Sequence, residues 1–242
     1  MLGPLAEHRI LIVPQLALLL GLSEDTVSRR LKRLRDAGHV HYGPVFDRAP
    51  WPARITGPGL RAIGRPVNPP RERLQEHRHD VGVGWLWLAA RAGAFGEAER
   101  ILTDRGMRSA EAASSAPFAG EPYGVGLGTF GPHGQPQRHY PDLMIDTAGG
   151  HRVAVELELT QKSAERMRRI MTAYATDARI DAVLYVVPSR RLAELVTESA
   201  RRAGVADIVH VKRLAPDGIA GAEPGSKQRT RARAPVARGA ER

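Results

Sequence analysis

The stretch that decides the fold runs from Tyr140 to Lys162 and reads YPDLMIDTAGGHRVAVELELTQK. Two apolar segments flank a Thr-Ala-Gly-Gly turn, which predicts an antiparallel β-hairpin. The second segment alternates strictly, so we expect two faces: Val153, Val155, Leu157 and Leu159 on one, and Ala154, Glu156, Glu158 and Thr160 on the other. A pairing in which the residue numbers sum to 298 would place Asp142 directly opposite Glu156.

Carboxylates at these positions would gather on one face of the hairpin. Like charges opposite one another on a sheet are unfavourable, so Asp142, Glu156 and Glu158 need a neighbouring cation. The candidates are a divalent metal, Lys162 and Arg152. Because oxygen ligands without cysteine or a histidine pair favour magnesium or manganese over zinc, a metal here would be Mg²⁺ or Mn²⁺. The alternatives are a solvated polar face and a protein-binding surface without metal.

The residues after the hairpin predict an α/β domain with a central mixed sheet over 67–215. Helices are expected at 163–176 and 190–203, and strands at 182–187 and 207–211. The continuous apolar run AVLYVV at 182–187 is typical of a buried central strand. The order β-β-α-β-α-β then gives a sheet with flanking helices.

Residues 1–66 predict a winged helix-turn-helix domain, joined to the rest by a Gly- and Pro-rich linker at 64–70. Helices are expected at 2–8, from Pro14 to Gly21, and from Ser23 to Gly38, with strands at 39–42 and 54–55 and a short helix at 59–63. The third helix has an apolar stripe formed by Val27, Leu31 and Leu34.

The other face of that third helix predicts contact with double-stranded DNA. Short hydroxyls near the start of a helix and a cluster of cations suit the major groove, where cations meet phosphates and guanidinium groups read guanine. The candidate DNA-binding residues are Thr26, Ser28, Arg29, Arg30, Lys32 and Arg33. The alternative is an amphipathic helix with a solvated charged face.

Composition excludes several classes of protein. The 242 residues include no cysteine, so disulfides, Cys-ligated zinc, iron–sulfur clusters and thiol nucleophiles are excluded. The formal net charge is +10, and the excess of Lys and Arg lies in 1–66 and in 216–242, a segment whose Ala-, Gly-, Pro- and Arg-rich composition predicts a disordered basic tail. The longest apolar stretch, 10–22, is too short to span a bilayer, so no membrane contact and a cytoplasmic location are expected.

Three features between the two regions receive structural interpretations. Trp85 and Trp87 are expected in the core. Gly126–Gly131 matches GxGxxG but no helix follows, so a flexible loop is expected rather than a dinucleotide site. His77, His79 and Asp80 resemble part of a metal site or a phosphohydrolase dyad, but a second supporting cluster is absent from the sequence.

The acidic stretch resembles the paired-strand site of the PD-(D/E)XK nuclease superfamily, with Pro141 and Asp142 followed by Glu156 and Glu158. The resemblance implies that Asp142 and Glu156 bind metal and that a lysine two residues later supports water activation. Glu158 stands at that lysine position, and Lys162 is the candidate replacement. The implied catalytic set is Asp142, Glu156, Glu158 and Lys162, with Mg²⁺ as cofactor only if the site is catalytic; whether the chain is a metal-dependent DNA endonuclease stays open.

The whole arrangement is similar to the replication-relaxation family of plasmids and integrative elements. The winged N-terminal region, Glu76-His77 and the string VELELTQKS at 155–163 carry the similarity. It implies a DNA-binding protein of a mobile element acting in plasmid replication, relaxation or mobilisation, with a relaxase, a replication protein or a second copy as partner. The alternative is a noncatalytic DNA-binding accessory protein or transcriptional regulator whose nuclease-like domain docks a partner.

Overall fold

The predicted hairpin lies at the centre of the fold in the computed structural model of the protein, which describes residues 1–214 except 48, 66–67, 72, 114–122 and 132–133. Its strands are β7 (Leu143–Thr147) and β8 (Arg152–Leu157), which pair antiparallel as predicted. Leu143 pairs with Val155, which is the register in which the residue numbers sum to 298. The predicted tail at 216–242 and residues 66–67 of the predicted linker lie outside the described residues.

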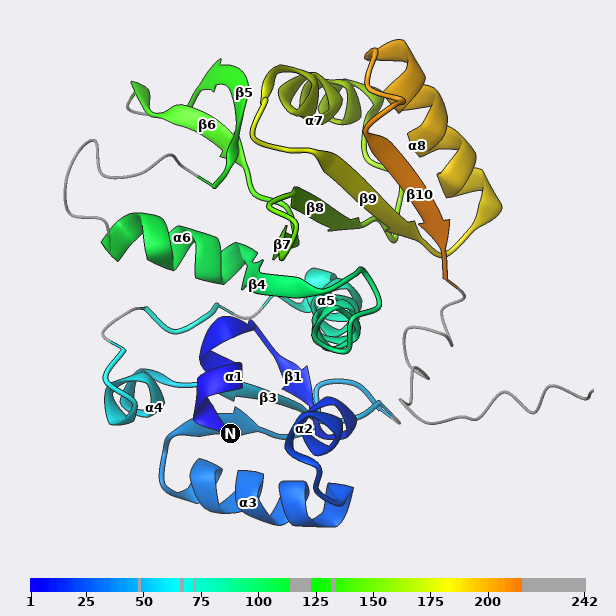
Figure 1. The fold of residues 1–242 in the computed structure, drawn as a ribbon. Helices are drawn as coiled ribbons and strands as arrows, with labels where there is room; N and C mark the ends of the chain where they lie inside the picture. The colour runs from blue at the N-terminus through cyan, green and yellow to red at the C-terminus, as the bar shows by residue number, and fades with distance from the viewer. Residues whose placement is uncertain (48, 66–67, 72, 114–122, 132–133, 215–242) are drawn as a thin grey trace, which may run out of the picture.

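Five strands form a mixed central sheet in the order β10-β9-β8-β7-β4 (Figure 1). The edge strand β4 (Ala98–Thr103) runs antiparallel to β7, as β7 does to β8. The strands β9 (Ala182–Val187) and β10 (Val209–Arg213) extend the sheet in parallel from β8. The prediction of an α/β protein with a mixed central sheet is therefore confirmed.

Helices cover both faces of this sheet. One face, which includes Ala154, packs against α7 (Ala164–Thr176) and α8 (Arg190–Arg202). The other face, which includes Val155 and Leu157, packs against α5 (His77–Arg91), where Trp85 and Trp87 lie in the core as predicted. Ser163 caps α7 by accepting a hydrogen bond from the Arg166 backbone, so the helix begins directly after Ser163.

The N-terminal region contains four helices and a small antiparallel sheet of order β1-β3-β2. Its elements are α1 (Leu2–Glu7), β1 (Leu11–Ile12), α2 (Val13–Leu20), α3 (Glu24–Asp36), β2 (Val40–Tyr42), β3 (Pro52–Ile55) and α4 (Gly57–Ala62). Gly21 ends α2 with a left-handed φ of 62°, and Ser23 caps α3 through the Thr26 backbone, as predicted. The apolar stripe of α3 packs inward, with Val27 and Leu31 buried and Leu34 half-buried.

Several elements, β1 among them, were not predicted, and one prediction is wrong. Val125–Phe130 forms strand β5, which pairs with β6 (Pro136–His139), so the flexible loop expected at Gly126–Gly131 is a strand. Because the segment is rich in glycine, its sequence lacks the apolar alternation that predicts a strand. Val125 at its start is nevertheless completely buried and packs against α7. The strand β4 and the helix α6 (Asp104–Ala113) were also not predicted. The strand lies at the edge of the sheet and carries exposed charged residues, which do not form an apolar pattern. A 3₁₀ turn (Leu74–Glu76) precedes α5.

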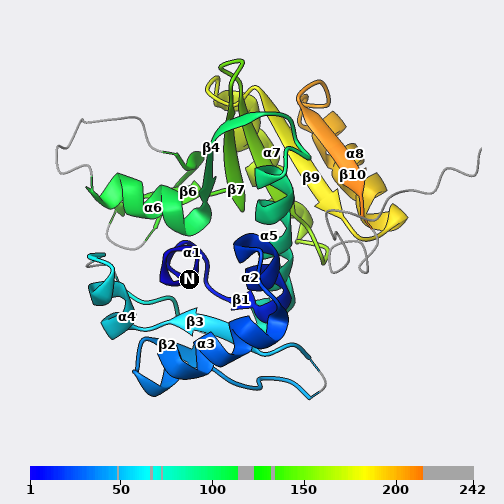
Figure 2. The same ribbon diagram turned by 60° about the horizontal axis from the view of Figure 1, so that its bottom comes forward.

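The N-terminal elements dock onto α5 through a buried glutamine. Gln15 Nε2 donates to the carbonyl of Val81 at 2.7 Å, and its Oε1 accepts from the Ile12 backbone at 3.0 Å. Gly84 allows this approach, since a Cβ there would lie 2.7 Å from Gln15 Nε2. Figures 1 and 2 show α3 on the side of the small sheet that faces away from the central sheet. None of the helices in the described part of the chain has the length and apolar character that crossing a membrane requires.

Candidate functional site

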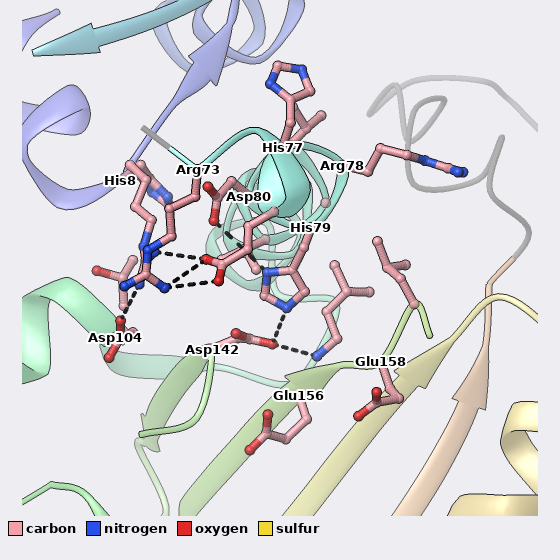
Figure 3. A pocket seen from close by; sticks show the side chains of 18 of the residues that line it. His8, Arg73, His77, Arg78, His79, Asp80, Asp104, Asp142, Glu156 and Glu158 are labelled. Atoms are coloured by element: carbon pink, nitrogen blue, oxygen red, sulfur yellow. Dashed lines mark hydrogen bonds and ion pairs between the residues drawn. The ribbon is translucent and has the colours of Figure 1, made fainter. Parts of the chain in front are cut away.

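A cavity of about 790 Å³ lies where the N-terminal region, the start of α5 and the end of β8 meet (Figure 3). Strand β8 and the chain after it contribute Glu156, Glu158 and Lys162 to its wall, and the residue before β7 contributes Asp142. The register of the hairpin explains this convergence, because Asp142 precedes β7 by one residue and Glu156 follows Val155. The structure therefore brings together all four residues of the predicted acidic site.

Asp142 is held by two partners. Its Oδ2 accepts a hydrogen bond of 2.7 Å from the Leu157 backbone and lies 3.1 Å from Nε2 of His79, a contact drawn in Figure 3. His79 Nδ1 lies 4.0 Å from Asp80 Oδ1. Burial lowers the pKa of His79, but Asp142 and Asp80 outweigh burial and raise this pKa to about 10. His79 is thus a cation at neutral pH and balances the charge of Asp142.

Glu156 is buried, yet its carboxylate is well supplied with donors. Its Oε1 accepts from the Tyr174 hydroxyl at 2.5 Å and lies 2.5 Å from Nε2 of His139. Burial raises the pKa of Glu156, but His139, the charge of Lys162 and the Tyr174 hydrogen bond together bring it below its usual value. Glu156 therefore carries a negative charge inside the protein.

Glu158 and Lys162 form an ion pair four residues apart. Burial, together with the charges of Glu156 and Asp142, raises the pKa of Glu158, and Lys162 opposes this rise. Of the two cations expected to compensate the acidic face, Lys162 does so. Arg152 does not, because its Nε pairs with Asp146 at 2.8 Å.

Two of the carboxylates each have one oxygen without a hydrogen bond among the described residues. In the described ranges no group of three or more His, Cys, Asp or Glu residues is arranged to hold a metal. The hydrogen bonds of Asp142 go to Oδ2 and those of Glu156 go to Oε1, so Oδ1 of Asp142 and Oε2 of Glu156 have none within the described structure. Two carboxylates suffice for Mg²⁺, which keeps several waters and takes further ligands from substrate phosphates.

Cations of two kinds line the rest of the cavity. Arg9 and Arg73 are held by Glu76. In contrast, Arg78, Arg138 and Arg166 are exposed and form no ion pair with any described residue. Cations without an acidic partner are available to phosphate groups, so the cavity combines a buried acidic centre with a basic surface.

The predicted DNA-binding residues all lie on α3, separate from the cavity. Arg29, Arg30, Lys32 and Arg33 are exposed and lack ion pairs within the described residues. Thr26 and Ser28 are half-buried: the hydroxyl of Thr26 accepts from Ser23 at 2.9 Å, and that of Ser28 accepts from Tyr42 at 3.4 Å. The two hydroxyls thus fix local geometry while the four cations face outward.

Sequence reasoning missed the histidines that complete the site. The sequence shows the cluster of His77, His79 and Asp80 but does not connect it with the acidic site. The partner of His79 is Asp142, 63 residues away in the sequence. His139 and Tyr174 carried no spacing that connects them to Glu156. His8 also lines the cavity, and its buried Nε2 has no hydrogen-bond partner among the residues that the structure describes. The one signal in the sequence was the position of His139, three residues before Asp142.

Comparison of the chain with family models, with curated proteins and with solved structures found no match.

Proposed function

We propose that the protein binds double-stranded DNA through α3, which acts as the recognition helix of a winged helix-turn-helix with the β2–β3 hairpin as its wing. The observation that carries the proposal is the outward face of α3, where Arg29, Arg30, Lys32 and Arg33 are exposed and unpaired with acids in the described residues. Lysine and arginine side chains in such an arrangement neutralise phosphates and supply most of the affinity for DNA.

The resemblance to the replication-relaxation family supports a role in plasmid replication, relaxation or mobilisation for a mobile element. In this role the protein acts in the cytoplasm, and a relaxase, a replication protein or a second copy of the chain is the partner. The same resemblance is compatible with a noncatalytic accessory protein, so the function of the cavity has to be tested separately.

A second activity, Mg²⁺-dependent cleavage of a phosphodiester bond, is favoured by the placement of Asp142 and Glu156. Their two oxygens, which have no hydrogen bonds within the described ranges, belong to residues that line a cavity with three exposed arginines. Asp142 and Glu156 would hold the ion, which when bound polarises the phosphate and lowers the pKa of a bound water. Glu158 would hold Lys162 in position, and Lys162 would stabilise the negative charge on the phosphate.

A supercoiled plasmid incubated with Mg²⁺, Mn²⁺ or EDTA, beside a gel shift on the same DNA, tests both activities. Asp142→Asn keeps the size of the side chain, and Asp146→Asn is the matched control because Asp146 pairs with Arg100 and Arg152 instead of lining the cavity. Metal-dependent nicking that only Asp142→Asn abolishes would support cleavage. Binding without nicking would support the noncatalytic accessory protein, and absence of both would reject the proposal.

A further inference from the structure

An aromatic side chain with a large exposed surface lies at the rim of the cavity. Phe46, in the loop between β2 and β3, is 44% exposed. Its ring contacts that of His77 in an edge-to-face arrangement at 4.9 Å between centroids. His77 and Pro50 both line the cavity; Phe46 does not line it but contacts His77, so its ring lies next to the cavity wall. An exposed ring fixed by a neighbouring ring is suited to stacking against a nucleobase.

The volume of the cavity indicates whether single-stranded or double-stranded DNA can enter it. A volume of about 790 Å³ is that of a pocket for a small molecule, and it is far too small for a duplex. Enzymes that act on nucleotides inside such pockets take unpaired or extruded nucleotides. The exposed face of α3 lies on the opposite side of the small sheet (Figures 1 and 2), so a duplex bound there does not enter the cavity.

Cations are placed to receive the backbone of one strand. Arg78 follows His77 at the rim, and Figure 3 shows its side chain pointing away from Asp142. Arg138 and Arg166 line the cavity, and all three arginines are exposed and form no ion pair within the described residues. Base stacking next to a basic groove is the combination by which proteins bind single strands without reading their sequence.

From these observations we infer that the cavity binds single-stranded DNA, with Phe46 stacking on an unpaired base at the rim and Arg138 and Arg166 contacting phosphates inside. The inference rests on the proposed function and specifies its substrate: α3 holds a duplex, while the cavity receives an unpaired strand next to it.

Fluorescence anisotropy with a labelled oligo(dT) of about 12 nucleotides, a length within the usual range of single-strand sites, tests this. Phe46→Ala should weaken binding at least about fivefold, since one stacked base contributes that much or more. Phe46→Tyr should keep the affinity. The matched control is Phe130→Ala, which removes a phenylalanine that is 72% exposed on β5 and does not line the cavity. Arg166→Ala should weaken binding and reduce its salt dependence.

Duplex binding measured on the same variants separates the two proposals. We expect Arg166→Ala, on α7, to leave duplex affinity unchanged and Arg29→Ala with Arg30→Ala to reduce it. If the wild type does not bind duplex DNA but binds oligo(dT) in a way that depends on Phe46, the proposed role of α3 is wrong and the proposed role of the cavity stands. Equal oligo(dT) affinities for Phe46→Ala and Phe130→Ala would overturn the inference, as would an equal loss of duplex and oligo(dT) binding in Arg166→Ala.

Discussion

The hydroxyl of Tyr174 on α7 donates a hydrogen bond of 2.5 Å to Oε1 of Glu156 on β8. Both side chains are buried, so this contact joins the hydrophobic core under α7 to the acidic end of the cavity. A buried carboxylate keeps its charge only where donors replace the water it has lost. The negative charge of Glu156 therefore depends on the packing of α7 against the sheet, because this packing places the Tyr174 hydroxyl beside the carboxylate.

Removing this hydroxyl should destabilise the fold. We expect Tyr174→Phe to lower the free energy of unfolding at pH 7 by about 1–3 kcal/mol, because a charged acceptor loses a buried donor. Urea denaturation checks this. Tyr185→Phe is the control: Tyr185 on β9 is equally buried, but its hydroxyl has no hydrogen bond among the described residues. Equal losses in the two variants would show that the hydroxyl of Tyr174 has no special role.

The cations of α3 should determine the salt dependence of duplex binding. For Arg29→Ala with Arg30→Ala we expect weaker binding and a log–log salt slope smaller by about 2, since each lost phosphate contact reduces it by about 0.9. The control removes the same charge from α8 through Arg190→Ala with Arg191→Ala. Titrations at several salt concentrations give the slopes, and an identical decrease in both variants would assign the effect to net charge alone.

Two glycines in α4 should respond differently to the same substitution. A Cβ at Gly59 would lie 2.1 Å from the backbone oxygen of His39, so Gly59→Ala forces the backbone of α4 away from β2. We expect a loss of about 2 kcal/mol or more in unfolding free energy. A Cβ at Gly57 meets only the end of Arg61 at 3.5 Å, so Gly57→Ala should be nearly neutral. Comparable stabilities would contradict the close approach of α4 to His39.

A buried histidine should make the protein sensitive to mild acid. Burial lowers the pKa of His8 to about 3, and its ring packs edge-to-face on Trp87 at 4.7 Å. Below the unfolded pKa of about 6.5, the unfolded chain binds a proton that the folded chain does not. Stability should therefore fall by up to about 1.4 kcal/mol per pH unit as pH drops from 6.5 towards 3, and His8→Phe should remove this contribution.

The check is urea unfolding at pH 7 and pH 5 for the wild type, His8→Phe and His210→Phe, in which the substituted histidine is exposed on β10. The loss between the two pH values should be smaller in His8→Phe only. If His8→Phe loses as much stability as the wild type, the histidine is not the source of the acid sensitivity.

Local pattern was sufficient for most helices and strands. The alternation of β8, the apolar run of β9 and the capping serines before α3 and α7 each act within a few residues, so the chain order could be read correctly. The strands β4 and β5 could not be read, because the first has charged residues at a sheet edge and the second is rich in glycine. Their positions depend on the pairing partners that other segments supply.

By itself, the sequence determined which residues of β8 share a face, because a period of two separates Glu156 and Glu158 from the apolar side chains. The pairing that brings Asp142 opposite Glu156 is one of the registers that this period allows, and the structure selects it. It also determined the basic face of α3, because a helix period separates its apolar stripe from its cations. Only the tertiary structure decided which partner neutralises each carboxylate. His79, His139 and Tyr174 come from α5, β6 and α7, and such long-range contacts follow from the packing of whole elements rather than from residue spacing.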